Sequence, residues 1–165
     1  MKENLRIALV AHDGRKKELM EWANYNVMEL SKHTLYATGT TGKLLKEVTR
    51  LNPVTFTWEK PLKDKVTCLD SGPLGGDAEI GAMIAKGEID MLIFFCDNLI
   101  VQGHQSDIQG LSRLASLYNI AFATNRTTAD MLFTSSLIND PKYEITLPKC
   151  IEAYKNRKTY NFDNI

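Results

Sequence analysis

The sequence predicts an α/β domain built on a mostly parallel sheet, and three observations support this fold class. Runs with strand character alternate along the chain with segments in which apolar residues recur at helical spacing. The fourth strand run, Met91–Cys96, is apolar on both faces, which is typical of a central strand in a parallel sheet. Small polar residues follow several of the runs, at the strand ends where α/β sheets bind ligands.

The predicted strands are short apolar runs, several of them bounded by polar or glycine residues. They are Ile7–Ala11, Thr34–Ala37, Val66–Leu69, Met91–Cys96 and Ile120–Thr124. The helices between them are predicted from apolar residues spaced three or four apart. The first predicted helix has an apolar face marked by Leu19, Ala23, Val27 and Leu30, and the second and third span residues 43–51 and 78–85. The fourth has an apolar face from Ile108 to Ala115, and the fifth spans residues 127–134.

Two segments depart from this alternation. Residues 52–65 contain Pro53, Pro61 and several charges, which favours a surface loop or an inserted hairpin. Tyr143–Leu147 has the composition of an edge strand that stops at Pro148, and a polar C-terminal helix is expected after it.

Length and composition narrow the class of protein. A chain of 165 residues is expected to form one domain, residues 1–165, with a full hydrophobic core. Acidic and basic residues balance at 20 each, so we expect neither a nucleic-acid nor an anionic-membrane surface. The apolar run Leu5–Ala11 is too short and too charged for a signal peptide or a membrane span. Three widely spaced cysteines fit reduced thiols in a cytosolic protein.

The glycine-rich segment Ser71–Asp77 joins the third strand to the next helix. Glycines let a ligand approach the backbone closely, and Asp77 places a carboxylate at the same turn. An aspartate in this position is also typical of a helix N-cap, so the segment alone leaves a functional and a structural interpretation open.

The segment Thr38–Gly42 places hydroxyl groups and flexible backbone at a helix N-terminus, which attracts anions. It is not a Walker P-loop, because Ala37 stands at the first glycine position and Leu44 follows Lys43. No G-x-G-x-x-G fingerprint occurs in the chain, and a capped turn remains the alternative. His12 and Lys16 follow the first strand, where Lys16 would lie near an anion or on a solvated face.

Acidic and histidine side chains also follow the fourth strand. Asp97 ends it, and His104 and Asp107 come one loop later. His104 and Asp107 are possible metal ligands, but no further histidine or cysteine completes a site, so no metal is expected. His33 has no evident partner and is expected to be structural.

Several motifs together resemble those of the bacterial methylglyoxal synthase family, in register from about Arg6 to Arg157. They are V-A-H-D (10–13), Y-A-T-G-T-T-G (36–42), S-G-P-L-G-G-D (71–77), I-D-M-L-I-F-F-C-D (89–97), the spaced His104 and Asp107, and A-T-N-x-x-T-A-D (123–130). The resemblance implies a cytoplasmic lyase that converts dihydroxyacetone phosphate to methylglyoxal and inorganic phosphate. It also implies a three-layer α/β/α domain with a five-stranded sheet, assembled as a homohexamer, with no metal or organic cofactor.

The resemblance assigns roles to particular residues. Asp77 matches the general base, His104 the histidine that hydrogen-bonds the substrate oxygens, and Asp107 a further active-site acid. The positions that match substrate and phosphate contacts are His12, Lys16, Thr38, Gly39, Thr40, Thr41, Ser71 and Gly72. The positions that match charged residues near subunit interfaces, where phosphate acts as an allosteric inhibitor, are Asp13, Arg113 and Arg157.

Three features depart from the family pattern: no proline lies between His104 and Asp107, Cys96-Asp97-Asn98 replaces an aromatic-Asp-Pro, and residues 52–65 are longer than usual. Two other functions share parts of the pattern. Related regulatory domains keep the phosphate-binding turns but lack the catalytic carboxylate, and an aldose-ketose isomerase shares the first proton abstraction.

Overall fold

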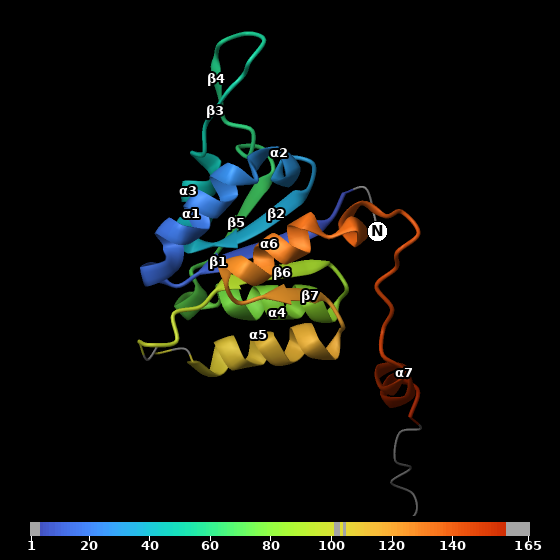
Figure 1. Cartoon of the computed structure of the whole chain (residues 1–165). Helices are drawn as coiled ribbons and strands as arrows, with labels where there is room; N and C mark the ends of the chain where they lie inside the picture. Colours follow the sequence, from blue (N-terminus) through green and yellow to red (C-terminus); the bar gives the residue numbers. More distant parts are fainter. Residues whose placement is uncertain (1–3, 101–102, 104, 158–165) are drawn as a thin grey trace, which may run out of the picture.

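The computed structural model describes residues 4–100, 103 and 105–157. Five parallel strands form one sheet, as expected from the sequence, and their order is β5-β2-β1-β6-β7. A separate antiparallel pair, β3 and β4, projects from the body of the molecule (Figure 1). The strands are β1 (Arg6–Ala11), β2 (Thr34–Thr38), β3 (Arg50–Leu51), β4 (Trp58–Glu59), β5 (Val66–Leu69), β6 (Met91–Phe95) and β7 (Ala121–Ala123).

Helices cover both faces of the sheet and give the expected three layers (Figure 1). One face packs against α1 (Lys16–Tyr25), α2 (Val27–Leu30), α3 (Gly39–Lys46) and α6 (Arg126–Thr134), and the other against α4 (Gly76–Ala85) and α5 (Gln105–Leu117). A last helix, α7 (Lys149–Lys155), follows an extended segment, and short 3-10 turns lie at η1 (Asp13–Arg15), η2 (Gly72–Leu74) and η3 (Ser136–Asn139). None of the helices in the described ranges is long and apolar enough to cross a membrane.

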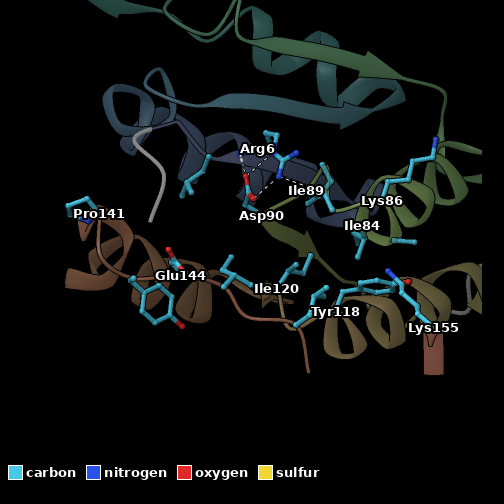
Figure 2. A pocket seen from close by; sticks show the side chains of 16 residues that line it. Arg6, Ile84, Lys86, Ile89, Asp90, Tyr118, Ile120, Pro141, Glu144 and Lys155 are labelled. Atoms are coloured by element: carbon cyan, nitrogen blue, oxygen red, sulfur yellow. Dashed lines mark hydrogen bonds and ion pairs between the residues drawn. The ribbon is translucent and has the colours of Figure 1, made fainter. Parts of the chain in front are cut away.

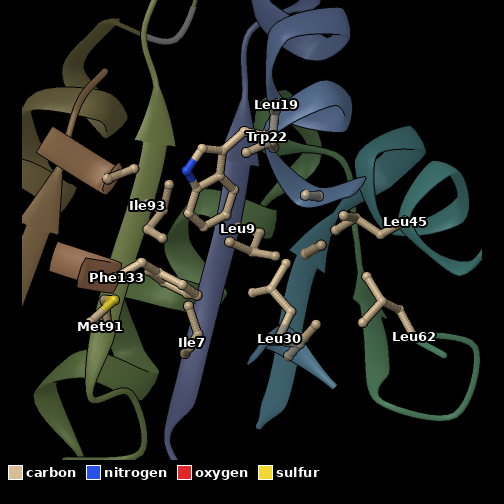
Figure 3. Close-up of a cluster of buried hydrophobic side chains, with 14 of the residues drawn as sticks. Ile7, Leu9, Leu19, Trp22, Leu30, Leu45, Leu62, Met91, Ile93 and Phe133 are labelled. Atoms are coloured by element: carbon tan, nitrogen blue, oxygen red, sulfur yellow. The ribbon is translucent and has the colours of Figure 1, made fainter. Parts of the chain in front are cut away.

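The two central strands divide their side chains between two hydrophobic clusters. Ile7 and Leu9 of β1 join the cluster under α1, α2, α3 and α6, whereas Ala8 and Val10 join the cluster under α4 and α5. Figure 3 shows the first cluster, in which the indole of Trp22 lies over β1 and β6. Because both faces of β1 and β6 are buried, their sequences are apolar without alternation, as expected for central parallel strands.

The strand order reverses between β1 and β6, so the helices that follow these two strands cover opposite faces of the sheet. Ala8 pairs with Leu92 and Ala11 with Phe95, which brings the carboxyl ends of both strands to the same level. In open α/β sheets ligands bind in the crevice outside such a switch point. A ligand is therefore expected to bind beside the chain segments that follow β1 and β6.

Two predicted helices differ from the observed ones. The face marked by Leu19 and Leu30 is buried as expected, but Asn26 interrupts the helix and divides it into α1 and α2. The helix expected over residues 43–51 begins at Gly39 and ends at Lys46. Glycine and threonine have weak helix propensity, which hid this first turn from sequence analysis.

The segment 52–65 is only partly the peripheral excursion that its composition predicts. Its first half forms the turn and second strand of the β3–β4 hairpin, which confirms the hairpin alternative. Its second half returns to the protein, where Leu62 is completely buried in the main hydrophobic cluster.

The edge strand expected at Tyr143–Leu147 is wrong. These residues lie outside the sheet, whose edges are β5 and β7, and they pair with no strand among the described residues. The polar helix expected after them is present as α7.

The buried His33 leads to a prediction about pH and stability. Its side chain is 2 % exposed, and Nδ1 accepts the Leu5 N–H at 3.3 Å. Burial lowers the pKa of His33 below its usual 6.5, although the negative charge of Glu29 acts in the opposite direction and raises it. Below pH 6.5 the unfolded chain therefore binds a proton more readily than the folded one, so stability should fall as the pH drops from there toward the folded pKa.

The measurement is urea denaturation of the wild type and a His33→Gln variant at about pH 7.5 and about pH 5.5. The titration of His33 should make the wild type lose more stability on acidification than the variant does. An equal loss in both proteins would contradict the assignment.

Candidate active site

A cleft of about 660 Å³ opens at the carboxyl ends of the strands. Its walls come from the segments after β1, β2 and β5 and from the first turns of α3, α4 and α5. Most of the residues predicted to form the site line it: His12, Lys16, Thr38, Gly39, Thr40, Thr41, Ser71, Gly72, Asp77 and Asp107. The fold therefore brings together residues that are spread over nearly a hundred positions of sequence.

The first turn of α3 forms one side of the cleft. Thr38 is its N-cap residue but its side chain caps no N–H, and the Gly39 N–H donates to the Asp70 carbonyl at 3.1 Å. Thr41 is 1 % exposed, and its hydroxyl has no hydrogen-bond partner among the described residues. A helix start carries a partial positive charge and N–H groups with no acceptor within the helix. Together with the Thr41 hydroxyl, this turn is suited to binding an oxyanion.

Lys16 brings a positive charge to the same turn. Its ammonium group donates to the Thr40 hydroxyl at 2.7 Å and also pairs with the Asp13 carboxylate. The hydrogen bond and the charge of Lys16 lower the pKa of Asp13 below its usual value. The side chain of Asp13 is almost fully exposed, so this ion pair positions Lys16 but contributes little to stability.

Asp77 lies deeper in the cleft, with only 2 % of its surface exposed. It is the second residue of α4, and the N-cap position belongs to Gly75, so the interpretation of Asp77 as an N-cap is wrong. The carboxylate packs against Gly72: a Cβ atom on that residue would lie 2.9 and 3.0 Å from the two carboxylate oxygens. A buried carboxylate in contact with glycine backbone leaves room for a small substrate to approach it.

His12 follows β1 and lies edge-on to the Phe94 ring, with 4.9 Å between the ring centroids. Its Nδ1 accepts the backbone N–H of Asp97 at 2.8 Å. The neutral imidazole therefore carries its proton on Nε2, which makes Nε2 a hydrogen-bond donor. In the sequence Asp97 is evident only as a polar residue at a strand end, whereas its backbone N–H fixes the tautomer of a histidine 85 positions earlier.

Cys96 lies next to this pair, but its thiol is not available as a base or nucleophile. The thiol donates to the Phe94 carbonyl at 3.3 Å, and burial raises its pKa to about 11. It therefore stays protonated at neutral pH. Among the described residues, no three histidine, cysteine or acidic side chains lie close enough to bind a metal ion together.

The remaining predicted residues have different placements. His104 lies outside the described residues. Asp107 lines the cleft from the first turn of α5, and Asp13, which the resemblance places near a subunit interface, lines it as well. Arg113 is exposed on α5, and the Arg157 guanidinium stacks 3.7 Å from the Tyr154 ring centre, so neither belongs to the cleft of its own chain.

Comparison with known proteins identifies the family. The sequence model described as MGS-like domain matches residues 18–124 of the chain. A methylglyoxal synthase from Treponema socranskii is 46 % identical over 143 residues, which are 87 % of this chain and 85 % of that protein. The chain belongs to the methylglyoxal synthase family.

Other members of the family cover the chain equally well. A methylglyoxal synthase from Coxiella burnetii strain RSA 493 is 46 % identical over 92 % of this chain and 96 % of its own length. The crystal structure of methylglyoxal synthase from Elizabethkingia anophelis NUHP1 superposes with a TM-score of 0.78 at 36 % sequence identity, covering 98 % of this chain and 96 % of that one. The resemblance and the fold class expected from the sequence are confirmed.

The contact between Gly72 and Asp77 leads to a prediction. In a Gly72→Ala variant the added methyl group would overlap both carboxylate oxygens, so Asp77 must turn away from its present position. Misplacing a reacting group by about 1 Å can cost about a hundredfold in rate. We expect the lyase activity to fall by at least about tenfold while the far-UV circular dichroism and the melting temperature stay close to wild type.

Gly110→Ala is the matched control, because a Cβ atom on this α5 residue would have no atom within 4 Å among the described residues outside the adjoining backbone of its own helix. It should leave turnover unchanged. Equal turnover by the Gly72→Ala variant and the control would show that the close approach of Gly72 does not position the carboxylate.

Proposed function

We propose that this member of the methylglyoxal synthase family is a lyase that converts dihydroxyacetone phosphate to methylglyoxal and inorganic phosphate. The observation that supports this most directly is that a buried carboxylate, Asp77, and an uncapped helix start, at α3, line the same cleft. The reaction needs a base for a proton next to a ketone and a site for a phosphate group. The relatives are named methylglyoxal synthase, which agrees with the proposed product.

The phosphate group of the substrate binds at the first turn of α3 in this proposal. Its oxygens accept hydrogen bonds from backbone N–H groups and from the hydroxyls of Thr40 and Thr41, and the Lys16 ammonium balances part of its charge. A phosphate oxygen also provides a partner for the buried Thr41 hydroxyl, which would otherwise have lost its water without compensation.

Asp77 then removes a proton from the hydroxymethyl carbon of the bound substrate. The electron pair of the broken C–H bond forms a carbon–carbon double bond, and negative charge develops on the former carbonyl oxygen. The Nε2–H of His12 is oriented as a donor for a substrate oxygen, and the resemblance assigns a similar role to His104. A neutral imidazole that donates to an enediolate is the arrangement of triosephosphate isomerase.

Loss of phosphate completes the reaction. The hydroxyl group on the former hydroxymethyl carbon loses its proton and becomes the aldehyde oxygen, while the electrons of the enediolate double bond form a new double bond to the carbon that carries the phosphate. The bond between that carbon and the bridging oxygen breaks, releasing inorganic phosphate. The resulting enol takes up a proton on carbon to give methylglyoxal, and Asp107, at the edge of the cleft, is suited to relay protons. Elimination requires the breaking bond to stand out of the enediolate plane, so the α3 site sets geometry as well as affinity.

Two alternative functions predict a different outcome with the same substrate. An aldose-ketose isomerase would return the proton to the neighbouring carbon and keep the phosphate attached, and a regulatory domain would bind the substrate without turnover. Incubating the purified protein with dihydroxyacetone phosphate and measuring methylglyoxal and free phosphate together distinguishes the three. Equal amounts of both products are expected.

Replacing the base gives a direct prediction. Asp77→Asn keeps the size and polarity of the side chain but removes the proton acceptor, so turnover should fall by at least about a hundredfold. Affinity for inorganic phosphate, measured by calorimetry, should change little because the α3 turn is untouched. Normal turnover in this variant would rule out Asp77 as the base and make Asp107 the next residue to test.

The Thr41 hydroxyl gives a second prediction. Thr41→Val keeps the shape of the side chain but removes a buried hydroxyl that has no partner among the described residues. The variant should be as stable as the wild type or slightly more so, yet bind inorganic phosphate about tenfold more weakly, as the loss of one hydrogen bond to a charged group implies. Unchanged phosphate affinity would show that the hydroxyl takes no part in anion binding.

The resemblance also leads us to propose a homohexamer in the cytoplasm that is inhibited by phosphate. Arg113 and Arg157 are both exposed and lie away from their own cleft, which suits contacts with another subunit. Asp13, through its pair with Lys16, is the member of this set that touches the cleft directly.

A further inference from the structure

The β3–β4 hairpin, residues 50–59, carries an exposed surface for which the proposed reaction has no use. Between Arg50 and Glu59, eight consecutive residues are uncharged, in a chain with 24 % charged residues. The exposed fractions of Val54, Phe56 and Trp58 are 83 %, 78 % and 71 %. A loop that only meets water would not concentrate large apolar side chains in this way, so the hairpin has the character of a contact surface.

The turn of the hairpin is held in one conformation. The Asn52 N–H donates to the Thr57 carbonyl at 2.9 Å, and the Asn52 side chain accepts the Val54 N–H at 2.9 Å. Phe56 adopts φ +53°, a left-handed conformation that costs free energy for an aromatic residue. The aromatic side chains are therefore presented by an ordered turn, which lowers the entropy lost when they bind.

A second exposed apolar feature lies elsewhere on the chain. A groove of about 500 Å³ runs between the amino ends of β1 and β6 and the segment Tyr143–Leu147, which leads to α7 (Figure 2). Ile84, Ile89 and Ile120 contribute apolar side chains to it, and Lys86 and Lys155 lie at one end. The groove shares no residue with the cleft that contains Asp77.

One wall of the groove is an incomplete strand. Tyr143–Leu147 has strand composition and is not helical, but no ladder hydrogen bond joins it to another strand in the described part of the chain. Its main-chain contacts there are a turn bond from the Tyr143 N–H to Asp140 and a bond from the Asn119 side chain to the Thr146 carbonyl. The segment thus retains backbone groups that can pair with an added strand.

We propose that the β3–β4 hairpin of one copy docks into this groove on a second copy. An outer edge of the hairpin pairs with Tyr143–Leu147, and Phe56 and Trp58 cover the apolar groove. A second copy is the occupant because each surface supplies what the other lacks. Among the described residues the hairpin pairs with no other strand and carries apolar side chains, and the groove has a segment that joins no sheet and an apolar floor.

The two surfaces cannot meet within one chain. The hairpin projects from one side of the molecule, whereas the segment leading to α7 descends along another (Figure 1). The lysines at the end of the groove also suit aromatic side chains, since an ammonium group over a ring is attracted to it, as Lys155 already is to Tyr118 at 5.9 Å. The contact joins two different surfaces, so each copy can bind one neighbour through its hairpin and another through its groove.

Sedimentation velocity of the full chain over a range of concentrations tests the proposal. Phe56→Ser/Trp58→Ser removes the aromatic side chains, and Leu147→Asp places a charge in the groove wall, where Leu147 is 43 % exposed. Each should raise the concentration at half-dissociation by at least about tenfold, because buried aromatic anchors carry much of the free energy of an interface. Met131→Ser on α6, at a residue that is 67 % exposed, is the control and should assemble as the wild type does.

Mixing the two variants gives a further test, because the hairpin variant keeps an intact groove and the Leu147→Asp variant keeps an intact hairpin. The mixture should form a complex larger than either variant forms alone at the same concentration. A monomeric wild type, or unchanged assembly in either variant, would overturn the proposal. So would loss of binding to anionic phospholipid vesicles by the hairpin variant with assembly intact, which would assign the aromatic side chains to a membrane surface.

Discussion

The carbonyl oxygen of Asp70 joins the two helix starts that form the cleft. It accepts the N–H of Gly39, the first residue of α3, at 3.1 Å. It also lies 2.0 Å from the position that a Cβ atom on Gly76, the first residue of α4, would occupy, so only glycine fits there. The start of α3, which is suited to an anion, and the start of α4, which carries Asp77, are thus held against one peptide group. The distance between these two helix starts is therefore set by backbone contacts rather than by flexible side chains.

A second backbone contact links the chain segments that follow β1 and β6, where the strand order reverses. The Asp97 N–H follows β6 and donates to Nδ1 of His12, which follows β1. This bond ties the two strand ends together at the crevice, and it also sets which nitrogen of the imidazole is a donor. Parallel strand order brings the chain segments to one edge of the sheet, and these two contacts then set the positions of the reactive groups.

The sequence predicted the parts of this arrangement that depend on local patterns. The strands were evident from apolar runs, and Thr38–Gly42 from its composition, because both signals lie within a few neighbouring residues. The contacts made by Asp70 and Asp97 were not predictable, because they join backbone groups whose positions depend on how strands pair. At Tyr143–Leu147 the sequence predicted an element that does not form. The composition suits a strand, but a strand also needs a neighbour to pair with, and the described part of the chain supplies none.

The two helix starts also resolve an electrostatic conflict in the proposed reaction. A phosphorylated substrate and the carboxylate of Asp77 are both negative, and a buried site with low dielectric strengthens their repulsion. In the proposed complex each negative group has its own helix N-terminus, α3 for the phosphate and the first turn of α4 for Asp77, where the helix dipole favours negative charge. Lys16 adds its charge on the phosphate side through Thr40. In the proposed reaction the two helix starts and Lys16 thus offset the repulsion between the phosphate and the base.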